Sequence, residues 1–275
     1  MASTGSVWIC QTCAVEHAEP VGVCAICADD RQWTPAGGQR WVTLTELAAA
    51  GHRTVVSELE PDLLGVEVEP QVGIGQQMKV LATRAGVLLW DPVGFVDEAA
   101  VARIRALGEV RAIVASHPHM YGAQVEWSRV LGGAEVLVAE LDRGWVARPD
   151  PVVRAWTGEL EVLPGVTLSQ PGGHYPGSTV VHWAAGADGR GVILSGDTLF
   201  ANPDRTSVAF MRSYPNHVPL SAAVTDRITR HLERYPFDRL YGNFTNVIDR
   251  DARAIVRRSA DRHIAWIRGD HDALT

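Results

Sequence analysis

Four cysteines near the N-terminus are spaced like the ligands of one metal ion. They follow the pattern C-x2-C, ten further residues, C-x2-C, and are Cys10, Cys13, Cys24 and Cys27. A two-residue gap lets both thiolates of a turn point at one ion, and two such knuckles supply the four sulfurs of a tetrahedral site. We therefore predict a structural zinc ion here, with iron in a rubredoxin-like site and a redox dithiol pair as the alternatives.

The residues around the cysteines favour a closed metal site over disulfides. The start of the chain lacks the basic and apolar blocks of a secretion signal, and disulfides are rare in reducing compartments. A site with four sulfur ligands leaves no open position for a substrate. His17, between the knuckles, is predicted to be a loop residue and not a ligand. The module resembles zinc ribbons and rubredoxin-like modules, and its surface offers a contact for a protein partner.

A second group of candidate ligands lies further along the chain, where predicted strands end. The segments are 116–122, 171–178, 194–200 and 240–244, and they carry His117 with His119, then His174, Asp197 and Asn243. Residues just past the carboxyl ends of strands converge on one edge of a sheet, where α/β folds place their sites. Three imidazoles and one carboxylate suit zinc, and also iron or manganese.

The elements that must position these residues alternate between strands and helices. We predict strands at 54–59, 66–70, 78–83, 87–91, 111–115, 135–139, 166–169, 179–184 and 191–195, and helices at 98–107, 123–131, 219–234 and 249–267. Strand hairpins followed by strand–helix units are typical of a layered α/β domain with mixed sheets. The turn-rich segment 29–39 is predicted to connect a small module, residues 1–40, to the main domain, residues 41–275.

The order of the motifs resembles that of the metallo-β-lactamase fold superfamily. H-x-H comes first, then G-G-H-x-P-G-S, then S-G-D-T-L-F, and the resemblance covers roughly residues 54–267. It implies an αββα sandwich of two mixed sheets with a metal site at one edge. Members of this superfamily are mostly hydrolases of esters, thioesters, lactams or phosphodiesters, and a minority are oxygen-using iron enzymes.

The sequence also departs from this family at the residues that normally bind a second metal ion. The family motif is H-x-H-x-D-H, and its last two positions are Tyr121 and Gly122 here. The late family histidine falls at Asn243. The positions of the first metal site are retained as His117, His119 and His174, and Asp197 matches the residue that usually bridges two ions. The resemblance therefore implies one pocket metal, zinc or iron, with Asp197 as its fourth ligand.

This ligand set predicts a metal-dependent hydrolase that acts on a small ester, thioester or lactone-like substrate. Tyr121 would donate a hydrogen bond to bound water or to a developing oxyanion, and Asp197 would take part in catalysis. Asn243 would line the pocket, and Arg212 would hold an anionic substrate by bidentate bonds. Two other functions remain open: a catalytically degenerate protein that binds a metal or a partner, and a mononuclear iron oxygenase.

Composition places the chain among ordinary globular proteins. It has 275 residues, of which 46% are hydrophobic and 21% are charged, enough for a sizeable core. The net charge of −7 argues against nucleic acid as a partner, because nucleic-acid binding needs a basic surface. No apolar run is long enough to span a membrane. We therefore expect a cytoplasmic protein with a small-molecule substrate.

Overall fold

The computed structural model describes residues 7–275 and divides the chain into two compact units. The first unit extends to Trp156, and the second runs from Thr157 to Thr275. The four cysteines, His117 and His119 belong to the first unit. His174, Asp197 and Asn243 belong to the second. Each unit is described by itself.

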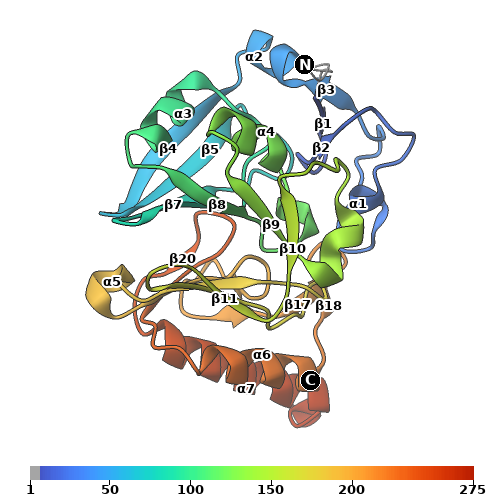
Figure 1. Cartoon of the computed structure of the whole chain (residues 1–275). Coiled ribbons are helices and arrows are strands. Elements are labelled where there is room, and N and C mark those ends of the chain that lie inside the picture. Colours follow the sequence, from blue (N-terminus) through green and yellow to red (C-terminus); the bar gives the residue numbers. More distant parts are fainter. Residues whose placement is uncertain (1–6) are drawn as a thin grey trace. The chain divides into compact units, whose positions relative to one another are not determined.

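The first unit is built on a seven-stranded sheet in the order β10-β9-β8-β7-β6-β5-β4. The strands are β4 (Arg53–Glu60), β5 (Leu63–Glu69), β6 (Met78–Thr83), β7 (Gly86–Trp90), β8 (Val110–Val114), β9 (Glu135–Ala139) and β10 (Val153–Trp156). Strands β4 to β7 form antiparallel pairs, and β7 to β10 form parallel ones. Parallel strands need crossover connections, which include α3 (Glu98–Arg105) and α4 (Gln124–Val130). Figure 1 shows both helices on the same side of this sheet.

The central strand β7 is a continuous apolar run, and the neighbouring β8 ends in one, as expected where both faces of a sheet are covered. All five residues of β7 are buried, and so are the last three of β8. Parallel sheets with both faces packed have this pattern, in place of the alternation seen on a half-exposed strand. The loops that follow β7 and β8 therefore leave a rigid part of the unit. The second of these loops carries His117 and His119.

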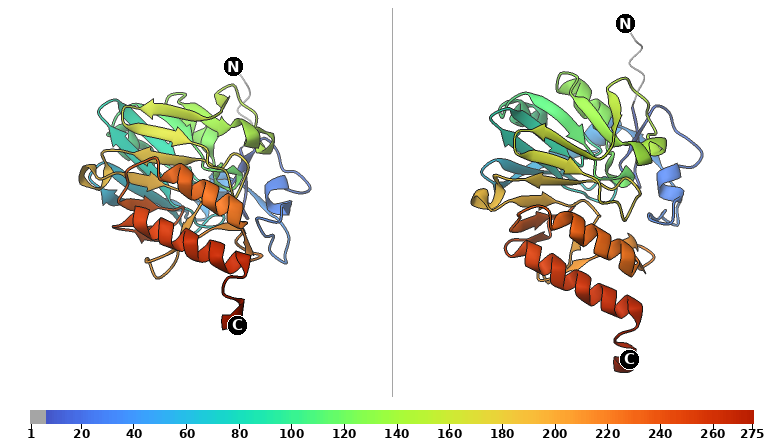
Figure 2. Two further views of the ribbon diagram at one scale, coloured as in Figure 1. Left: turned by 90° about the horizontal axis from the view of Figure 1, so that it is seen from below. Right: turned by 60° about the horizontal axis from the view of Figure 1, so that its bottom comes forward.

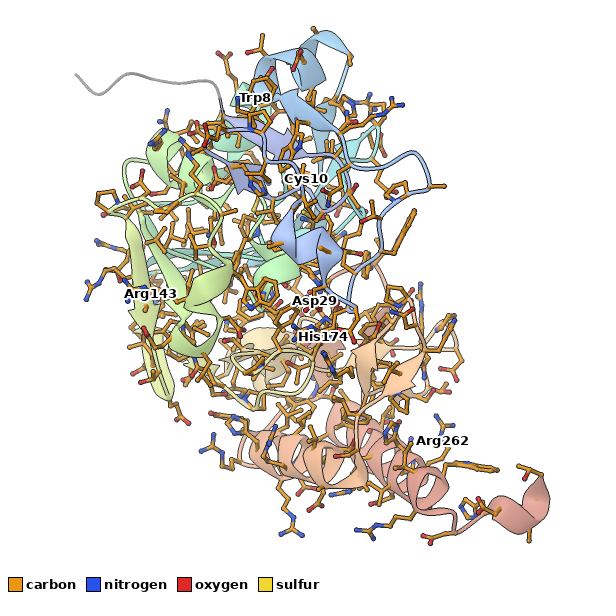
Figure 3. The ribbon with its side chains drawn as sticks, turned by 90° about the vertical axis from the view of Figure 1, so that its right-hand side faces the viewer. Trp8, Cys10, Asp29, Arg143, His174 and Arg262 are labelled. Atoms are coloured by element: carbon orange, nitrogen blue, oxygen red, sulfur yellow. The ribbon has the colours of Figure 1, made fainter. Side chains whose placement is uncertain are left out.

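The N-terminal module forms part of the first unit. Its strands are β1 (Trp8–Cys10), β2 (Glu16–His17) and β3 (Trp41–Thr43), in the order β2-β1-β3, and Figure 3 labels Trp8 and Cys10 at the two ends of β1. Two short helices, α1 (Ala25–Ala28) and α2 (Leu44–Ala49), complete it. The prediction that His17 is a loop residue was wrong. It pairs with Trp8 in β2 and is 5% exposed, because the chain turns back directly after Cys13.

The second unit contains a six-stranded sheet in the order β11-β12-β13-β14-β19-β20. The strands are β11 (Glu159–Leu163), β12 (Val166–Ser169), β13 (Val180–Trp183), β14 (Val192–Leu194), β19 (Arg239–Tyr241) and β20 (Val247–Ile248). The short strands β15 (Phe200–Ala201) and β16 (Val208–Ala209) pair, as do β17 (Met211–Ser213) and β18 (Val218–Pro219). Helices α6 (Ala222–Leu232) and α7 (Ala252–Arg268) run side by side in Figures 1 and 2. Ile228, Val256 and Ile193 belong to the core that they cover.

The remaining helical elements are short turns. They are α5 (Gly186–Gly189) and the 3-10 turns η1 (Pro118–Met120), η2 (Glu140–Trp145) and η3 (Asp272–Leu274). Among the described residues, no helix is both long and apolar enough to cross a membrane.

Most predicted elements are confirmed, and three of them have the predicted ends. The strands Met78–Thr83, Glu135–Ala139 and Val166–Ser169 are observed as predicted. The predicted helix at 219–234 begins later, at Ala222, because the side chain of Ser221 accepts a hydrogen bond from the Val224 N–H and caps it. Strands β10 and β11 were missed, since both are partly exposed and carry charged residues among the apolar ones.

Candidate metal centres

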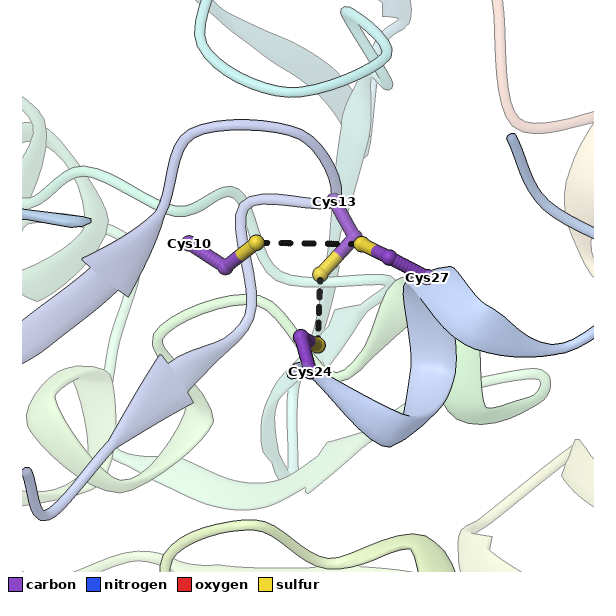
Figure 4. A group of neighbouring side chains, drawn as sticks. All are labelled: Cys10, Cys13, Cys24 and Cys27. Atoms are coloured by element: carbon purple, nitrogen blue, oxygen red, sulfur yellow. Dashed lines mark hydrogen bonds between the residues drawn. The ribbon is translucent and has the colours of Figure 1, made fainter. Parts of the chain in front are cut away.

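The four cysteine sulfurs form a compact group in the first unit (Figure 4). The sulfurs of Cys10 and Cys27 are 3.7 Å apart, and those of Cys13 and Cys24 are 3.9 Å apart. A tetrahedral zinc ion with Zn–S bonds of about 2.3 Å requires sulfurs that are roughly 3.8 Å apart. The observed separations match that value and far exceed the length of a disulfide bond, about 2.05 Å. The donor set and its geometry therefore fit a four-sulfur metal site.

The backbone around the first knuckle explains why the sulfurs converge. The Cys10 N–H donates to Val15 O at 3.0 Å, and the Ala14 N–H donates to Cys10 O at 2.8 Å. Ala14 has a left-handed φ of 65°, which reverses the chain between Cys13 and β2. In the second knuckle, the Cys24 N–H donates to the side-chain oxygen of Gln39 at 2.7 Å.

The electrostatics of this group favour a cation among the sulfurs. The neighbouring Cys10 sulfur raises the pKa of Cys13 well above its usual value, because a thiolate there faces other sulfurs at close range. A bound divalent ion removes that repulsion and holds all four sulfurs as thiolates. The Nε2 atom of His17 lies 3.6 Å from the Cys24 sulfur, and the His17 ring meets the edge of Trp41. His17 is thus positioned to donate a hydrogen bond to a ligand sulfur.

His117 and His119 follow β8 in the first unit, and each is 2% exposed. The ring centroids of the two histidines are 5.1 Å apart. Ser116 Oγ lies 2.9 Å from His117 Nδ1, so that nitrogen is engaged and Nε2 is the atom to bind a metal. The two imidazoles leave the sheet next to each other because the short turn η1 follows His117 at once.

Asp91 fixes the start of this histidine loop from the end of the neighbouring strand β7. Its Oδ1 accepts a hydrogen bond from the Ser116 N–H at 2.6 Å. Asp91 is fully buried, and burial raises its pKa to about 7, although the Ser116 N–H opposes that change. Burial likewise lowers the pKa of the nearby Lys79 to about 8. This carboxyl group therefore orients the loop from inside the core.

The second unit contributes His174 and Asp197, also just past strand ends. His174 is 1% exposed, and its Nδ1 lies 3.3 Å from Met211 O, so Nε2 is again the atom to bind a metal. The loop before it needs glycine at position 173, where φ is 119° and a Cβ would lie 2.7 Å from Ile228 Cδ1. Asp197 follows β14, is 6% exposed, and accepts a hydrogen bond from Asn243 Nδ2 at 2.9 Å.

The other residues singled out from the sequence have defined places. The Tyr121 hydroxyl is buried and donates to Asp142 O at 3.0 Å in the first unit. In the second unit, Asn243 is buried after β19, and Arg212 is half-buried in β17. Sequence reasoning missed Tyr214, whose hydroxyl donates to Asp197 O at 3.4 Å. Burial raises the pKa of Tyr214 well above its usual value, so the phenol stays protonated.

The last position of the family histidine motif is closed to any side chain. Gly122 has a left-handed φ of 49°, and a Cβ placed there would lie 1.8 Å from Pro92 O. A histidine at this position would have to displace the backbone that follows β7. The absence of the family residue is therefore built into the packing of the first unit.

Comparison with known proteins identifies a relative and a fold. No known family model matches the sequence. The uncharacterised protein YmaE of Bacillus subtilis (strain 168) is 37% identical over 262 residues, which cover 94% of this chain and 95% of YmaE. Among solved structures, the DIM-1 metallo-β-lactamase superposes with a TM-score of 0.58 at 12% identity and covers 78% of this chain and 98% of its own.

A second solved structure supports the same fold. MEM-A1, a subclass B3 metallo-β-lactamase isolated from a soil metagenome library, superposes with a TM-score of 0.51 at 17% identity, over 79% of this chain and 97% of its own. At such low identities the likeness shows the fold alone. It confirms the α/β class and the resemblance that the motifs predict. The chain belongs to the same family as YmaE and has the metallo-β-lactamase fold.

Proposed function

We propose that this protein is a single-metal hydrolase of small ester, thioester or lactone-like substrates. The proposed ligands of the pocket metal are His117, His119, His174 and Asp197. Each of these side chains is buried in a segment that follows a strand: the first two histidines follow β8, His174 lies between β12 and β13, and Asp197 follows β14. The same residue types hold metal ions in hydrolases, with zinc as the commonest choice. We propose zinc in this pocket and a second, structural zinc at the four cysteines.

The closed position at Gly122 carries the proposal of one pocket metal. The residues that match the family's second metal site are Tyr121, Gly122 and Asn243. None of them is a strong zinc ligand near neutral pH. Gly122 has no space for a replacement side chain, and the Tyr121 hydroxyl already donates to Asp142 O. A second ion would thus lack its usual ligands.

The surroundings of the proposed ligands support their orientation. Nδ1 of His117 is engaged by Ser116, and Nδ1 of His174 is engaged by Met211 O. Such bonds fix the tautomer and raise the basicity of the nitrogen that binds the metal. Asn243 holds one oxygen of Asp197, which directs the carboxylate.

A bound zinc ion supplies a Lewis acid and lowers the pKa of a bound water toward about 7. The protein's own groups would place the substrate against it. Arg212 is the candidate to hold an anionic substrate group, and Asn243 keeps Asp197 in one orientation. Tyr121 would donate to an oxyanion only by giving up its bond to Asp142 O. We also propose a cytoplasmic setting, where reducing conditions keep the four thiols available for metal.

Turnover of a substrate panel tests the proposal. Wild-type protein, stripped of metal and then reloaded with zinc, is assayed with aryl esters, an acyl thioester and lactones. Zinc-dependent turnover of at least one class is expected, together with its loss in His174→Ala. His217→Ala, which changes an exposed histidine of the same unit, is the matched control and should retain activity. Absence of zinc-dependent turnover across the panel would contradict the hydrolase function.

A further inference from the structure

Glu16 connects the four-cysteine group to the loop that carries His117 and His119. It lies in β2, three residues after Cys13, and its side chain is 2% exposed. Its N–H donates to Gly122 O at 2.9 Å. Its Oε1 accepts from the Val125 N–H, and its Oε2 accepts from Arg148 Nη1 at 2.6 Å. The backbone and the side chain of one residue thus hold both ends of the segment 122–125.

Helix α4, which follows the histidine loop, depends on this carboxylate for its first turn. Its N-cap residue is Ala123, which has no side chain able to accept a hydrogen bond. The first N–H groups of a helix lack partners within the helix and are usually satisfied by a nearby Ser, Thr, Asn or Asp. Glu16, which is distant in sequence, serves as the N-terminal cap because its side chain accepts a hydrogen bond from the Val125 N–H. Burial raises the pKa of Glu16 to about 7, whereas the Val125 N–H and Arg148 favour its charged form, which also suits the helix dipole.

The arrangement of the four cysteine sulfurs determines the position of Glu16. The knuckle bond from the Cys10 N–H to Val15 O ties the residue directly before β2 to the first ligand pair. Ala14 is packed so closely that a Cβ on Gly94 would lie 2.4 Å from Ala14 O. The cysteines and the buried residues Met120 and Tyr121 belong to one apolar cluster. A change in the arrangement of the sulfurs must therefore move Glu16 or break its contacts.

The buried side chain of Arg148 also links Glu16 to helix α4. Arg148 Nη1 contacts Glu16 Oε2 and also lies 2.7 Å from Glu126 Oε1, on helix α4. The side chain of Arg148 is 8% exposed and that of Glu126 is 17% exposed. Solvent therefore screens these contacts weakly. Glu126 is thus held in the same network as Glu16.

We propose that Glu16 is a positioning residue for the pocket metal and couples it to the four-cysteine site. The ordered cysteine site places Glu16, Glu16 places the segment 122–125, and that segment fixes the loop of His117 and His119. Binding of an ion at either site then strengthens binding at the other, since coupling between two sites is reciprocal. The proposal rests on the single pocket metal of the proposed function. It adds that the N-terminal module controls the occupancy of that metal.

Cobalt substitution of the full-length protein separates the two sites. Thiolate-bound Co²⁺ gives intense charge-transfer absorption together with d–d bands, whereas histidine and carboxylate ligands give only weaker d–d bands. With one equivalent of Zn²⁺ at the thiolates, which bind it more tightly than Co²⁺, the remaining d–d bands belong to the pocket. Chelator competition, followed in these bands, then gives the affinity of the pocket. Glu16→Ala is expected to weaken pocket binding about 10- to 100-fold, as loss of a supporting group around ligands does, with the thiolate absorption retained. Glu16→Gln keeps an acceptor for the Val125 N–H and should fall between wild type and Glu16→Ala.

Glu19→Ala is the matched control, because Glu19 is an exposed glutamate of the same module. It should bind cobalt in the pocket as wild type does. Unchanged pocket affinity in Glu16→Ala would overturn the proposal. If that variant does not fold, wild type and His174→Ala supply the test: Co²⁺ should bind at the cysteines more tightly in wild type than in His174→Ala, whose pocket stays empty, and no difference would overturn the coupling. Failure of the proposed pocket metal looks different, because wild type itself would then bind no ion outside the cysteine site, and failure of the hydrolase function would appear only as absence of turnover by metal-loaded protein.

Discussion

Asn243 Nδ2 donates a hydrogen bond to Asp197 Oδ1 at 2.9 Å, across 46 residues of sequence. In the family pattern a histidine that binds metal stands at position 243. Here the amide at that position directs the carboxylate that we propose as a ligand. Asn243 therefore supports a proposed ligand at the position where the motif that the sequence resembles has a ligand of its own.

Asn243→Ala is expected to weaken pocket-metal binding about 10- to 100-fold, because supporting hydrogen bonds hold a ligand in its binding orientation. Chelator competition on the full-length protein measures this change. Asn216→Ala, an exposed asparagine of the same unit, is the control and should bind as wild type does. Equal affinities for Asn243→Ala and the control would show that this hydrogen bond does not orient the ligand.

Gly122→His, which restores the family residue, should destabilise the protein and bind no additional ion. The new side chain meets Pro92 O and must adopt a left-handed φ, at a combined cost of about 2–5 kcal/mol. Chemical denaturation and metal analysis measure the two effects. Gly132→His is the matched control, since Gly132 has a φ of 93° and open space around it. It should lose only the cost of the left-handed backbone, about 1–2 kcal/mol. A Gly122→His protein that is as stable as wild type and binds an extra ion would contradict the claim that position 122 has no space for a side chain.

The titration of His231 should make the free energy of unfolding depend on pH in the acid range. Its Nε2 lies 2.9 Å from Ser169 Oγ, and burial, with Arg234 nearby, lowers its pKa from 6.5 to about 4. Between these values the unfolded chain binds a proton that the folded protein does not. The free energy of unfolding should therefore fall as pH drops from about 6.5 toward 4, and this contribution is absent above 6.5.

Urea unfolding of wild type and His231→Asn across this pH range measures the effect as a difference. The difference in the free energy of unfolding between wild type and His231→Asn should change as the pH falls from 6.5 to 4. His217→Asn, at an exposed position, should leave the wild-type slope intact. Parallel curves for wild type and His231→Asn would contradict the assignment.

The sequence predicts most of the strands, because they depend on local patterns. Apolar runs such as residues 136–139 mark buried strands. The expectation that the candidate ligands follow strands of one sheet was wrong: β8, before His117, and β14, before Asp197, belong to two different sheets, and strand patterns do not record which sheet a strand joins.

The supporting contacts have no local pattern either. Glu16 and Arg148 are 132 residues apart, and no periodicity links them. The closure at Gly122 depends on the position of Pro92 O, which only the folded chain defines.

The role of His17 illustrates the same limit. Its place between the knuckles suggests a loop, yet it pairs in β2 and lies beside the Cys24 sulfur. The hydrogen bonds that turn the chain back directly after Cys13 join backbone atoms, so the pattern of side chains in the sequence does not predict them. Spacing thus predicts the ligands of the cysteine site but not the residues that surround them.

Metal content per chain tests the central claim most directly. Wild-type protein, purified without chelators and analysed by elemental mass spectrometry, should hold two ions, one at the four cysteines and one at His117, His119, His174 and Asp197. His174→Ala should hold one, with His217→Ala unchanged at two. Equal metal content in wild type and His174→Ala, or three ions in wild type, would contradict a single metal bound by these histidines.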